Sequence, residues 1–375
     1  GSPVGSSTVF ADFREAEQSE GSWLCTEAQG MERNRADWLA AARDALDAKA
    51  KPPGSLGALE DWAARLCALQ RTLTPRGGPA ATLIFAADHG VTKTRQVSAY
   101  PRVVTPAMFK AIARGQAASS VLSLAHGMKV VLVDVGIDGD VSDVGQCCPD
   151  VRVKHAKVCA GTEDIVDRAA MSLEQMETAM QAGRDAVQEL QADHQAVAVC
   201  LGELGIGNTT SAAALLSALS RQPPSQVTGK GTGLDEEGVA KKAEAISSAL
   251  ERCRAQELDP RGLLQEVGGL ELAAMVGAIF EASSRRMAVL VDGFVSGAAA
   301  LVALRIDPTV VQALFCTHKS AETGASVLLE ALQQPIAVMD LQLRLGEATG
   351  AILGAPLLKS AAALMRMATL KEAMS

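Results

Sequence analysis

The chain has 375 residues and a formal net charge of −8, with 48% hydrophobic and 21% charged residues. This composition supplies a sizeable apolar core and excludes a chain that is disordered as a whole. The acidic balance argues against a surface that binds nucleic acid or an anionic membrane. Aromatic residues make up only 3%, so alanine, leucine and valine must fill the core, which favours closely packed helices over a β-sandwich.

Residues 1–30 are rich in serine, glycine and glutamate and begin with Gly-Ser, so we expect a disordered tail outside the folded part. The tail has no secretory hydrophobic segment, and its acidic residues disfavour a mitochondrial leader. No apolar run in the chain reaches the ~18–20 residues that a membrane helix requires. The eight cysteines show neither CxxC nor Cys/His ligand spacing, which indicates free thiols in a reducing compartment. We therefore expect a cytoplasmic location and no membrane contact.

Two helices come first, at 34–49 and 57–72, joined by the breaker sequence KPPGSLG at 51–57. Short continuous apolar runs then alternate with helical patterns. Because these runs are apolar on both faces, they are typical of a parallel sheet covered by helices on both sides. The expected strands are 81–87, 129–135, 195–201, 287–291 and 312–316, and the expected helices are 172–192, 209–220, 235–254, 269–285 and a C-terminal helix at about 347–371.

Functional groups of such folds gather at the carboxyl ends of the parallel strands. In this chain that edge is expected to collect Asp88, His89, Glu203, Asp292 and His318. The C-terminal helix is expected to dock beside the two N-terminal helices.

Glu347 stands alone among glycines and apolar residues in the run RLGEATG at 344–350. Burial without a partner penalises the charged form of a carboxylate and raises its pKa, which suits a general base that works near pH 7. Two structural interpretations compete with this one. Glu347 could be a helix N-terminal glutamate favoured by the helix dipole, or it could form a surface ion pair with Arg344.

Two glycine-rich loops are candidate ligand sites. The first, at 202–210, joins a strand to an alanine-rich helix and could bind an anion at the helix N-terminus, although a simple capped turn is the alternative. Thr210 replaces the third glycine of a dinucleotide fingerprint, which disfavours NAD. The second loop, at 228–237, lacks P-loop spacing, and its acidic residues suit a first helical turn better than a metal site. Lys242, on the helix that follows, is a candidate anion ligand.

Seven motifs carry a resemblance to one family. They are KPPGSLG (51–57), DHGV (88–91), GELGIGNTT (202–210), GGLE (268–271), VDGF (291–294), SAE (320–322) and RLGE (344–347). In this order, and from about residue 34 to the end, the chain resembles the nicotinate-nucleotide–dimethylbenzimidazole phosphoribosyltransferase family.

The resemblance implies a homodimer with a large Rossmann-like domain at 79–347 and a small helical domain built from 31–78 and 348–375. It implies phosphoribosyl transfer from nicotinate mononucleotide to 5,6-dimethylbenzimidazole or a related aromatic base. The products are nicotinate and α-ribazole 5′-phosphate, the activated lower ligand of cobalamin. No metal or cofactor is implied. The cationic pyridinium leaves without an acid, whereas the azole N–H must lose its proton, so one buried carboxylate is the main requirement.

The resemblance also implies residue roles. Glu347 would be the catalytic base, and Glu203 a second catalytic glutamate. The implied nucleotide and phosphate contacts are Gly205, Gly207, Asn208, Gly231, Lys242, Ser320 and Leu345. The implied acceptor pocket consists of Tyr100, Met108, Asp88 and Leu204.

The chain departs from part of the family at two positions, because Tyr100 and Met108 stand where some bacterial members have Ser and Gln. We therefore expect a more apolar acceptor pocket, and the acceptor could be another azole, a purine or a phenol. An alternative of a different class is a nucleotide-binding regulatory protein without turnover. The presence of both Glu203 and Glu347 argues against it, because a pure binder has no use for a base.

Overall fold

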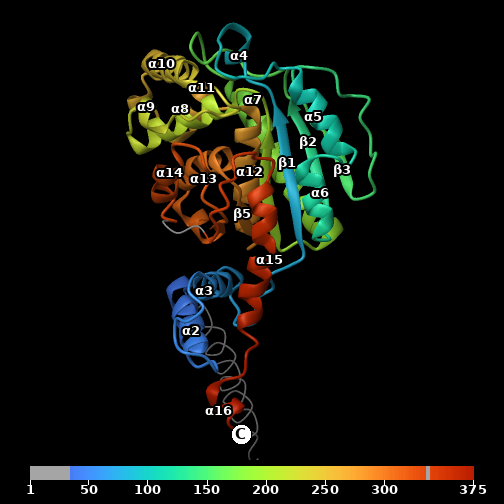
Figure 1. The fold of residues 1–375 in the computed structure, drawn as a ribbon, viewed down its shortest axis with the longest axis vertical. Coiled ribbons are helices and arrows are strands. Elements are labelled where there is room, and N and C mark those ends of the chain that lie inside the picture. Colours follow the sequence, from blue (N-terminus) through green and yellow to red (C-terminus); the bar gives the residue numbers. More distant parts are fainter. Residues whose placement is uncertain (1–33, 335–337) are drawn as a thin grey trace, which may run out of the picture.

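The computed structural model describes residues 34–334 and 338–375, so the expected tail at 1–30 lies outside the described residues. A six-stranded sheet forms the centre, with all neighbouring strands parallel and the order β3-β2-β1-β4-β5-β6 (Figure 1). This is the strand order of the doubly wound Rossmann fold, which confirms the predicted α/β class. The strands are β1 Ala80–Ala87, β2 Val130–Gly136, β3 Val151–His155, β4 Ala198–Leu204, β5 Ala288–Val291 and β6 Leu314–Cys316.

Helices cover both faces of the sheet. In Figure 1, α5, α6 and α15 lie on one side of it, and α7, α12 and α13 lie on the other. None of the helices in the described part of the chain combines the length and hydropathy of a membrane span. The helices are α2 Arg35–Asp47, α3 Ala58–Gln70, α4 Val91–Thr94, α5 Val104–Ala113, α6 Ala118–Ala125, α7 Leu173–His194, α8 Asn208–Ser220, α9 Pro224–Val227, α10 Glu236–Arg252, α11 Pro260–Val267, α12 Leu270–Ser284, α13 Phe294–Ile306, α14 Ala325–Ala331, α15 Thr349–Leu364 and α16 Leu370–Ala373, with 3₁₀ turns at Ala255–Glu257 and Pro308–Gln312.

The five predicted strands are present, and the structure adds a sixth, β3, at the edge of the sheet. Its sequence alternates between apolar and charged residues instead of forming a continuous apolar run. Arg152 and Lys154 of β3 form ion pairs with Asp193 and Glu189 of α7. Charged side chains of this kind are usual on an edge strand, where one side of the backbone has no strand partner.

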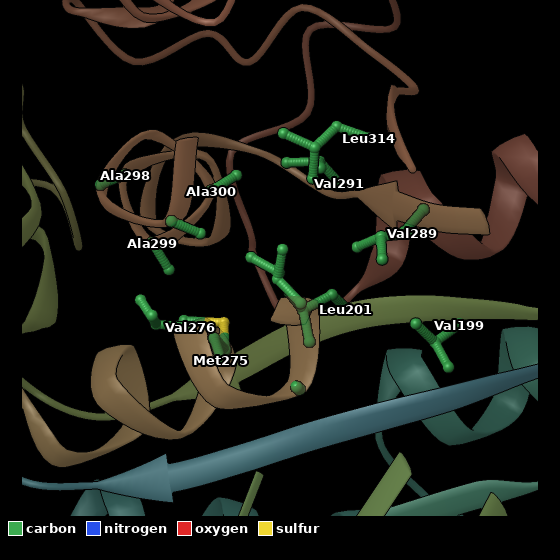
Figure 2. Close-up of a cluster of buried hydrophobic side chains, with 14 of the residues drawn as sticks. Val199, Leu201, Met275, Val276, Val289, Val291, Ala298, Ala299, Ala300 and Leu314 are labelled. Carbon is green, nitrogen blue, oxygen red and sulfur yellow. The ribbon is translucent and has the colours of Figure 1, made fainter. Parts of the chain in front are cut away.

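The core between the sheet and α12–α13 consists of small and branched side chains. Figure 2 shows side chains of β4, β5 and β6 meeting Met275 and Val276 of α12 and the alanines 298–300 of α13. Val199 and Leu201 of β4 stand in register with Val289 and Val291 of β5 on this face. Alternate residues of a strand point to opposite faces, so Cys200 and Gly202 point toward α15 instead. Consistent with this, the Cys200 thiol donates to the Ala351 carbonyl at 3.5 Å.

The two ends of the described chain meet below the sheet in Figure 1, where α2 and α3 lie beside the last turns of α15. Trp62 of α3 packs edge-on against Phe315 of β6, with ring centroids 5.4 Å apart. Lys49 and Thr369 form an antiparallel bridge between the segments that follow α2 and precede α16. The division into a large and a small domain at the predicted boundaries stays a prediction.

Candidate active site

The carboxyl end of β4 meets the turn that carries Glu347. Gly202 of β4 packs so closely on this turn that a Cβ at Gly202 would lie 2.6 Å from the Ala348 Cβ and 2.8 Å from the Glu347 carbonyl carbon. Asp292, which follows β5, reaches the same turn from the neighbouring strand. The structure thus brings together Glu203, Asp292 and Glu347, three acidic residues far apart in the sequence.

The turn has an unusual backbone. Gly346, Glu347 and Ala348 have φ values of 80°, 56° and 64°, all in the left-handed region. Such a conformation costs a non-glycine residue roughly 1–2 kcal/mol, so the surrounding contacts must hold it. The Asp292 carboxylate does this by accepting the Gly350 N–H at 2.6 Å and the Ala351 N–H at 3.3 Å at the start of α15.

The Glu347 side chain is 5% exposed. Ser119 of α6 donates its hydroxyl to Glu347 Oε2 at 3.2 Å. Burial raises the pKa of Glu347, and the hydrogen bonds from Ser119 oppose that rise in part. Glu347 precedes the N-cap Ala348 and is therefore not in the first turn of α15. The surface pair with Arg344 is wrong, because Glu347 is buried and makes no ion pair with a lysine or arginine of the described residues.

Glu203 lies beside this turn and is 7% exposed. The Asn208 amide donates to its Oε2, and Gly346 leaves no room for a side chain next to its Oε1. Burial, together with the nearby carboxylates of Asp292, Glu271 and Glu347, raises the pKa of Glu203 well above its ordinary value. This raised pKa favours the neutral, protonated form of the Glu203 carboxyl group.

Asp292 lies near these carboxyl groups. Burial raises its pKa to about 6, although hydrogen bonds from three main-chain N–H groups act to lower it. Glu271 of α12 accepts a hydrogen bond from His89 at 2.7 Å, and Ser211 bonds the other ring nitrogen of His89 at 3.0 Å. Within the described residues, no lysine or arginine forms an ion pair with Glu203, Glu271, Asp292 or Glu347. Glu271 and Asp292 instead have the rings of His89 and His318 within 4 Å. A group of buried carboxyl groups without a lysine or arginine partner favours a cationic ligand beside it.

The two predicted glycine loops meet at Lys242 of α10. Its Nζ donates to Thr209 Oγ1 at 2.8 Å and to the Gly229 carbonyl at 3.4 Å, and a Cβ at Gly231 would lie 3.3 Å from it. Lys242 is 1% exposed, and burial lowers its pKa to about 8. Within the described residues, no carboxylate forms an ion pair with this ammonium group, although the charge of Glu322 raises its pKa in part. A buried cation at the start of α8 favours an anion.

The first loop is held tightly against the end of β1. Gly207 has φ 101° and caps α8, and a Cβ there would lie 2.9 Å from the His89 Cβ. Gly205 packs on the main chain of Ala87. Asn208 is the first residue of α8, and its side-chain amide donates a hydrogen bond to Glu203. The simple capped turn considered from the sequence is thus joined to both the carboxylate group and the Lys242 site.

Ser320 and Leu345 lie on two loops joined by the bond from the Ala321 N–H to the Leu343 carbonyl at 2.9 Å. Ser320 is buried and accepts the Glu322 N–H at 3.3 Å, whereas Leu345 is 57% exposed. A Cβ at Gly293, just after β5, would lie 3.7 Å from the Ser320 Cβ. The loop that follows β6 and carries Ser320 therefore passes close to the end of β5.

The four predicted acceptor-pocket residues differ in burial and in their partners. Met108 of α5 packs on the apolar cluster that contains Leu204. Tyr100 lies outside that cluster and is 56% exposed. Asp88 is fully buried, and its two oxygens accept the Thr105 hydroxyl at 2.6 Å and the Asp138 N–H at 2.8 Å. Asp88 thus ties the start of α5 and the loop after β2 to the end of β1.

Several residues of the site had no role from sequence reasoning. Ser119 and Thr209 carry no sequence signal stronger than a position in a helical first turn, and the His89–Glu271 pair joins two motifs 182 residues apart. Within the described residues, no three His, Cys, Asp or Glu side chains gather in a way that could hold a metal ion.

Comparison with known proteins identifies the protein family. A family model described as phosphoribosyltransferase matches residues 31–374. The nicotinate-nucleotide–dimethylbenzimidazole phosphoribosyltransferase of Chromobacterium violaceum is 43% identical over 89% of this chain and 94% of its own length, and that of Thermus thermophilus is 42% identical over 89% and 97%. A crystal structure of CobT from Thermus thermophilus superposes with a TM-score of 0.85 at 41% identity and covers 90% of this chain and 98% of that one. The chain therefore belongs to the nicotinate-nucleotide–dimethylbenzimidazole phosphoribosyltransferase family.

Proposed function

We propose that this protein transfers the phosphoribosyl group of nicotinate mononucleotide to 5,6-dimethylbenzimidazole or a related aromatic base. The products are nicotinate and α-ribazole 5′-phosphate, the activated lower ligand of cobalamin. Relatives named for this reaction match the chain over nearly its whole length, which supports the substrates. The observation that carries the reaction type is the buried Glu347 carboxylate, which has a raised pKa and one hydroxyl partner.

In the proposed step, the unprotonated ring nitrogen of the base attacks C1′ of the ribose while the bond from C1′ to the nicotinate nitrogen breaks. The electron pair of that bond returns to the pyridine ring and neutralises it, so no acid is needed. The azole N–H proton passes to Glu347, which acts as a general base. Attack on the face opposite nicotinate inverts C1′ and gives the α-anomer.

Glu203 assists this step, and its raised pKa favours the neutral form of its carboxyl group. A neutral carboxyl group held by Asn208 can donate a hydrogen bond to a ribose oxygen. The negative charge that remains on the carboxyl groups of Glu203, Asp292 and Glu347 stabilises the pyridinium cation and the positive charge that develops at C1′. In this proposal Glu203 is a catalytic residue, and Asp292 positions Glu347 through the start of α15.

Binding of the two substrates is divided between the loops. Lys242 and Gly231, together with Gly205, Gly207 and Asn208, hold the phosphate, and Ser320 and Leu345 flank the nucleotide. Met108 and Leu204 form the apolar wall for the acceptor, and Tyr100 closes it from the exposed side. Asp88 contributes to this pocket by fixing the helix that carries Met108.

We propose further that the protein works as a homodimer in the cytoplasm. The dimer follows from the family resemblance. All seven cysteines of the described residues are free thiols, which agrees with a reducing compartment.

The test is a direct assay without added metal. Protein, nicotinate mononucleotide and 5,6-dimethylbenzimidazole are incubated together, and nicotinate and ribazole phosphate are separated by chromatography. We expect both products in equal amounts. Binding of the nucleotide without any product would support a regulatory binder instead, and release of nicotinate only with another azole or a phenol would retain the transfer but change the acceptor.

A further inference from the structure

A cavity lies at the end of the sheet opposite to the carboxylate group. Its volume is about 660 Å³, and its walls include Pro79 and Ala80 at the start of β1 and Met128 just before β2. Ala355 and Pro356 of α15 form the facing wall. A volume of this size lies in the range of ~300–1,000 Å³ that is common for small-molecule sites.

The charged residues around this cavity are all basic. These are Arg76, Lys359 and Arg366, with His126 nearby from a third part of the chain, and no aspartate or glutamate of the described residues lines the cavity. Within the described residues, neither arginine nor Lys359 forms an ion pair. All three are exposed, so they give this cavity a local positive charge in a protein with a net charge of −8, which favours an anion there.

The loop that carries Arg76 is fixed in place. The Gln70 side chain accepts the Arg76 N–H at 2.8 Å and donates to the Arg76 carbonyl at 2.9 Å. Gly77 packs directly on α15, because a Cβ there would lie 2.6 Å from the Lys359 Cα. The main chain that carries Arg76 is therefore fixed against the helix that carries Lys359.

We propose that this cavity binds a phosphate ester with a flat apolar group, such as a nucleoside monophosphate, at a site separate from the catalytic one. Arginine guanidinium groups match the geometry of phosphate oxygens, and several cations together give the contact more strength than one exposed pair. The apolar surface of Pro79, Met128 and Pro356 gives a flat ring a place to stack away from water.

The test uses AMP as the probe and isothermal titration calorimetry at low ionic strength. Lys242→Ala, which disables the phosphate contact of the proposed active site, is the background for all variants. We expect one saturable AMP site per chain in this background. The double substitution Lys359→Ala and Arg366→Ala should weaken it roughly tenfold or more, because two charge-assisted contacts are lost. Added salt should weaken it further.

Arg114→Ala with Arg305→Ala is the matched control, because both arginines are exposed and lie outside the cavity. This pair should leave AMP affinity within about twofold, since exposed charges away from a ligand contribute little. Absence of saturable AMP binding, or an equal loss in both double variants, would overturn the proposal. Binding of inorganic phosphate as tight as that of AMP would overturn the role of the apolar wall.

Sedimentation velocity tests the remaining possibility, that the cavity is a contact surface between two copies of the chain. If Lys359→Ala with Arg366→Ala changes the sedimentation coefficient and leaves AMP affinity intact, the cavity is an interface and the proposal fails. Turnover of the cavity variants, measured in the Lys242-containing protein without AMP, should equal that of the unsubstituted protein.

Discussion

Gly202 and Ala348 are packed against each other so closely that a Cβ on Gly202 would lie 2.6 Å from the Cβ of Ala348. Real Cβ atoms do not approach this closely, because van der Waals contact between carbon atoms begins near ~3.5 Å. The missing side chain at 202 is therefore a condition for the left-handed turn at 346–348, which in turn aims the Glu347 carboxylate. Strand β4 thus determines the position of a residue that lies 145 positions later in the chain.

The first prediction follows from this contact. Gly202→Ala should displace the turn, lower kcat by roughly tenfold or more, and retain the fold, because misplacing a catalytic group by about 1 Å can cost ~10²-fold in rate. Steady-state kinetics and thermal unfolding measure the two effects. Gly145→Ala is the control, since a Cβ at Gly145 meets nothing within 4 Å. Equal kinetics of the two variants would show that the turn tolerates the displacement.

Glu347→Gln tests the base directly. The amide has the same shape but cannot accept the azole proton, so we expect nucleotide binding to persist while kcat falls about 10²–10⁴-fold. Calorimetric titration with nicotinate mononucleotide gives the first quantity and product chromatography the second. A variant that keeps near-normal kcat at neutral pH would remove Glu347 from the base role.

The pH dependence of kcat/KM should be bell-shaped. Glu347 must be deprotonated to act, and its raised pKa moves the acid limb above the ordinary value of 4.5, so activity falls as the pH drops through that limb. Lys242 must be protonated to bind phosphate, and its pKa of about 8 places the alkaline limb near that value. Nicotinate riboside has no phosphate, so its profile should lack the alkaline limb. A limb near pH 8 with both substrates would assign it to another group.

Lys242→Ala should weaken the binding of nicotinate mononucleotide by about 1.5–3 kcal/mol, or roughly 10- to 150-fold, because one charge-assisted contact is lost. Binding of nicotinate riboside should change little. The two affinities, measured by calorimetry, give the comparison. An equal loss for both ligands would mean that Lys242 supports the loops through Thr209 and Gly229 and does not contact phosphate.

The acceptor pocket should select bases by shape. Met108 is flexible and apolar, so benzimidazole and its 5-methyl derivative should react within about two orders of magnitude of the dimethyl compound, because an apolar pocket separates close analogues by only ~1–3 kcal/mol. Tyr100→Ser with Met108→Gln should shift preference toward bases that can hydrogen-bond. Competition assays with paired acceptors measure both. Rejection of every benzimidazole would contradict the proposed acceptor.

Much of the fold was accessible from the sequence, because β1, β2, β4, β5 and β6 are continuous apolar runs. The edge strand β3 was not, since its alternating charged residues have no such signature. The predicted C-terminal helix at 347–371 is in fact two helices, α15 and α16. It begins later than expected because Glu347 and Ala348 adopt left-handed conformations that no local pattern predicts.

The site, like the fold, could be predicted from the sequence only in part. The sequence predicted Glu203 and Asp292 at one sheet edge, since each lies at the end of a strand, but it did not place Glu347 beside them. It could not predict the hydroxyl of Ser119 on Glu347 or the Thr209 contact of Lys242, because these depend on the packing of α6 and α10 against the loops. The exposure of Tyr100 depends likewise on the path of a loop.

The bridge between Lys49 and Thr369 has a consequence for biosynthesis. The helices α2 and α3 are translated about 300 residues before their partners in α15 and the segment before α16. Contacts between residues so distant in sequence carry a large loop-closure entropy and form late. The apolar residues of these two helices therefore stay uncovered until α15 has been made, and exposed apolar surface of this kind favours aggregation of a nascent chain.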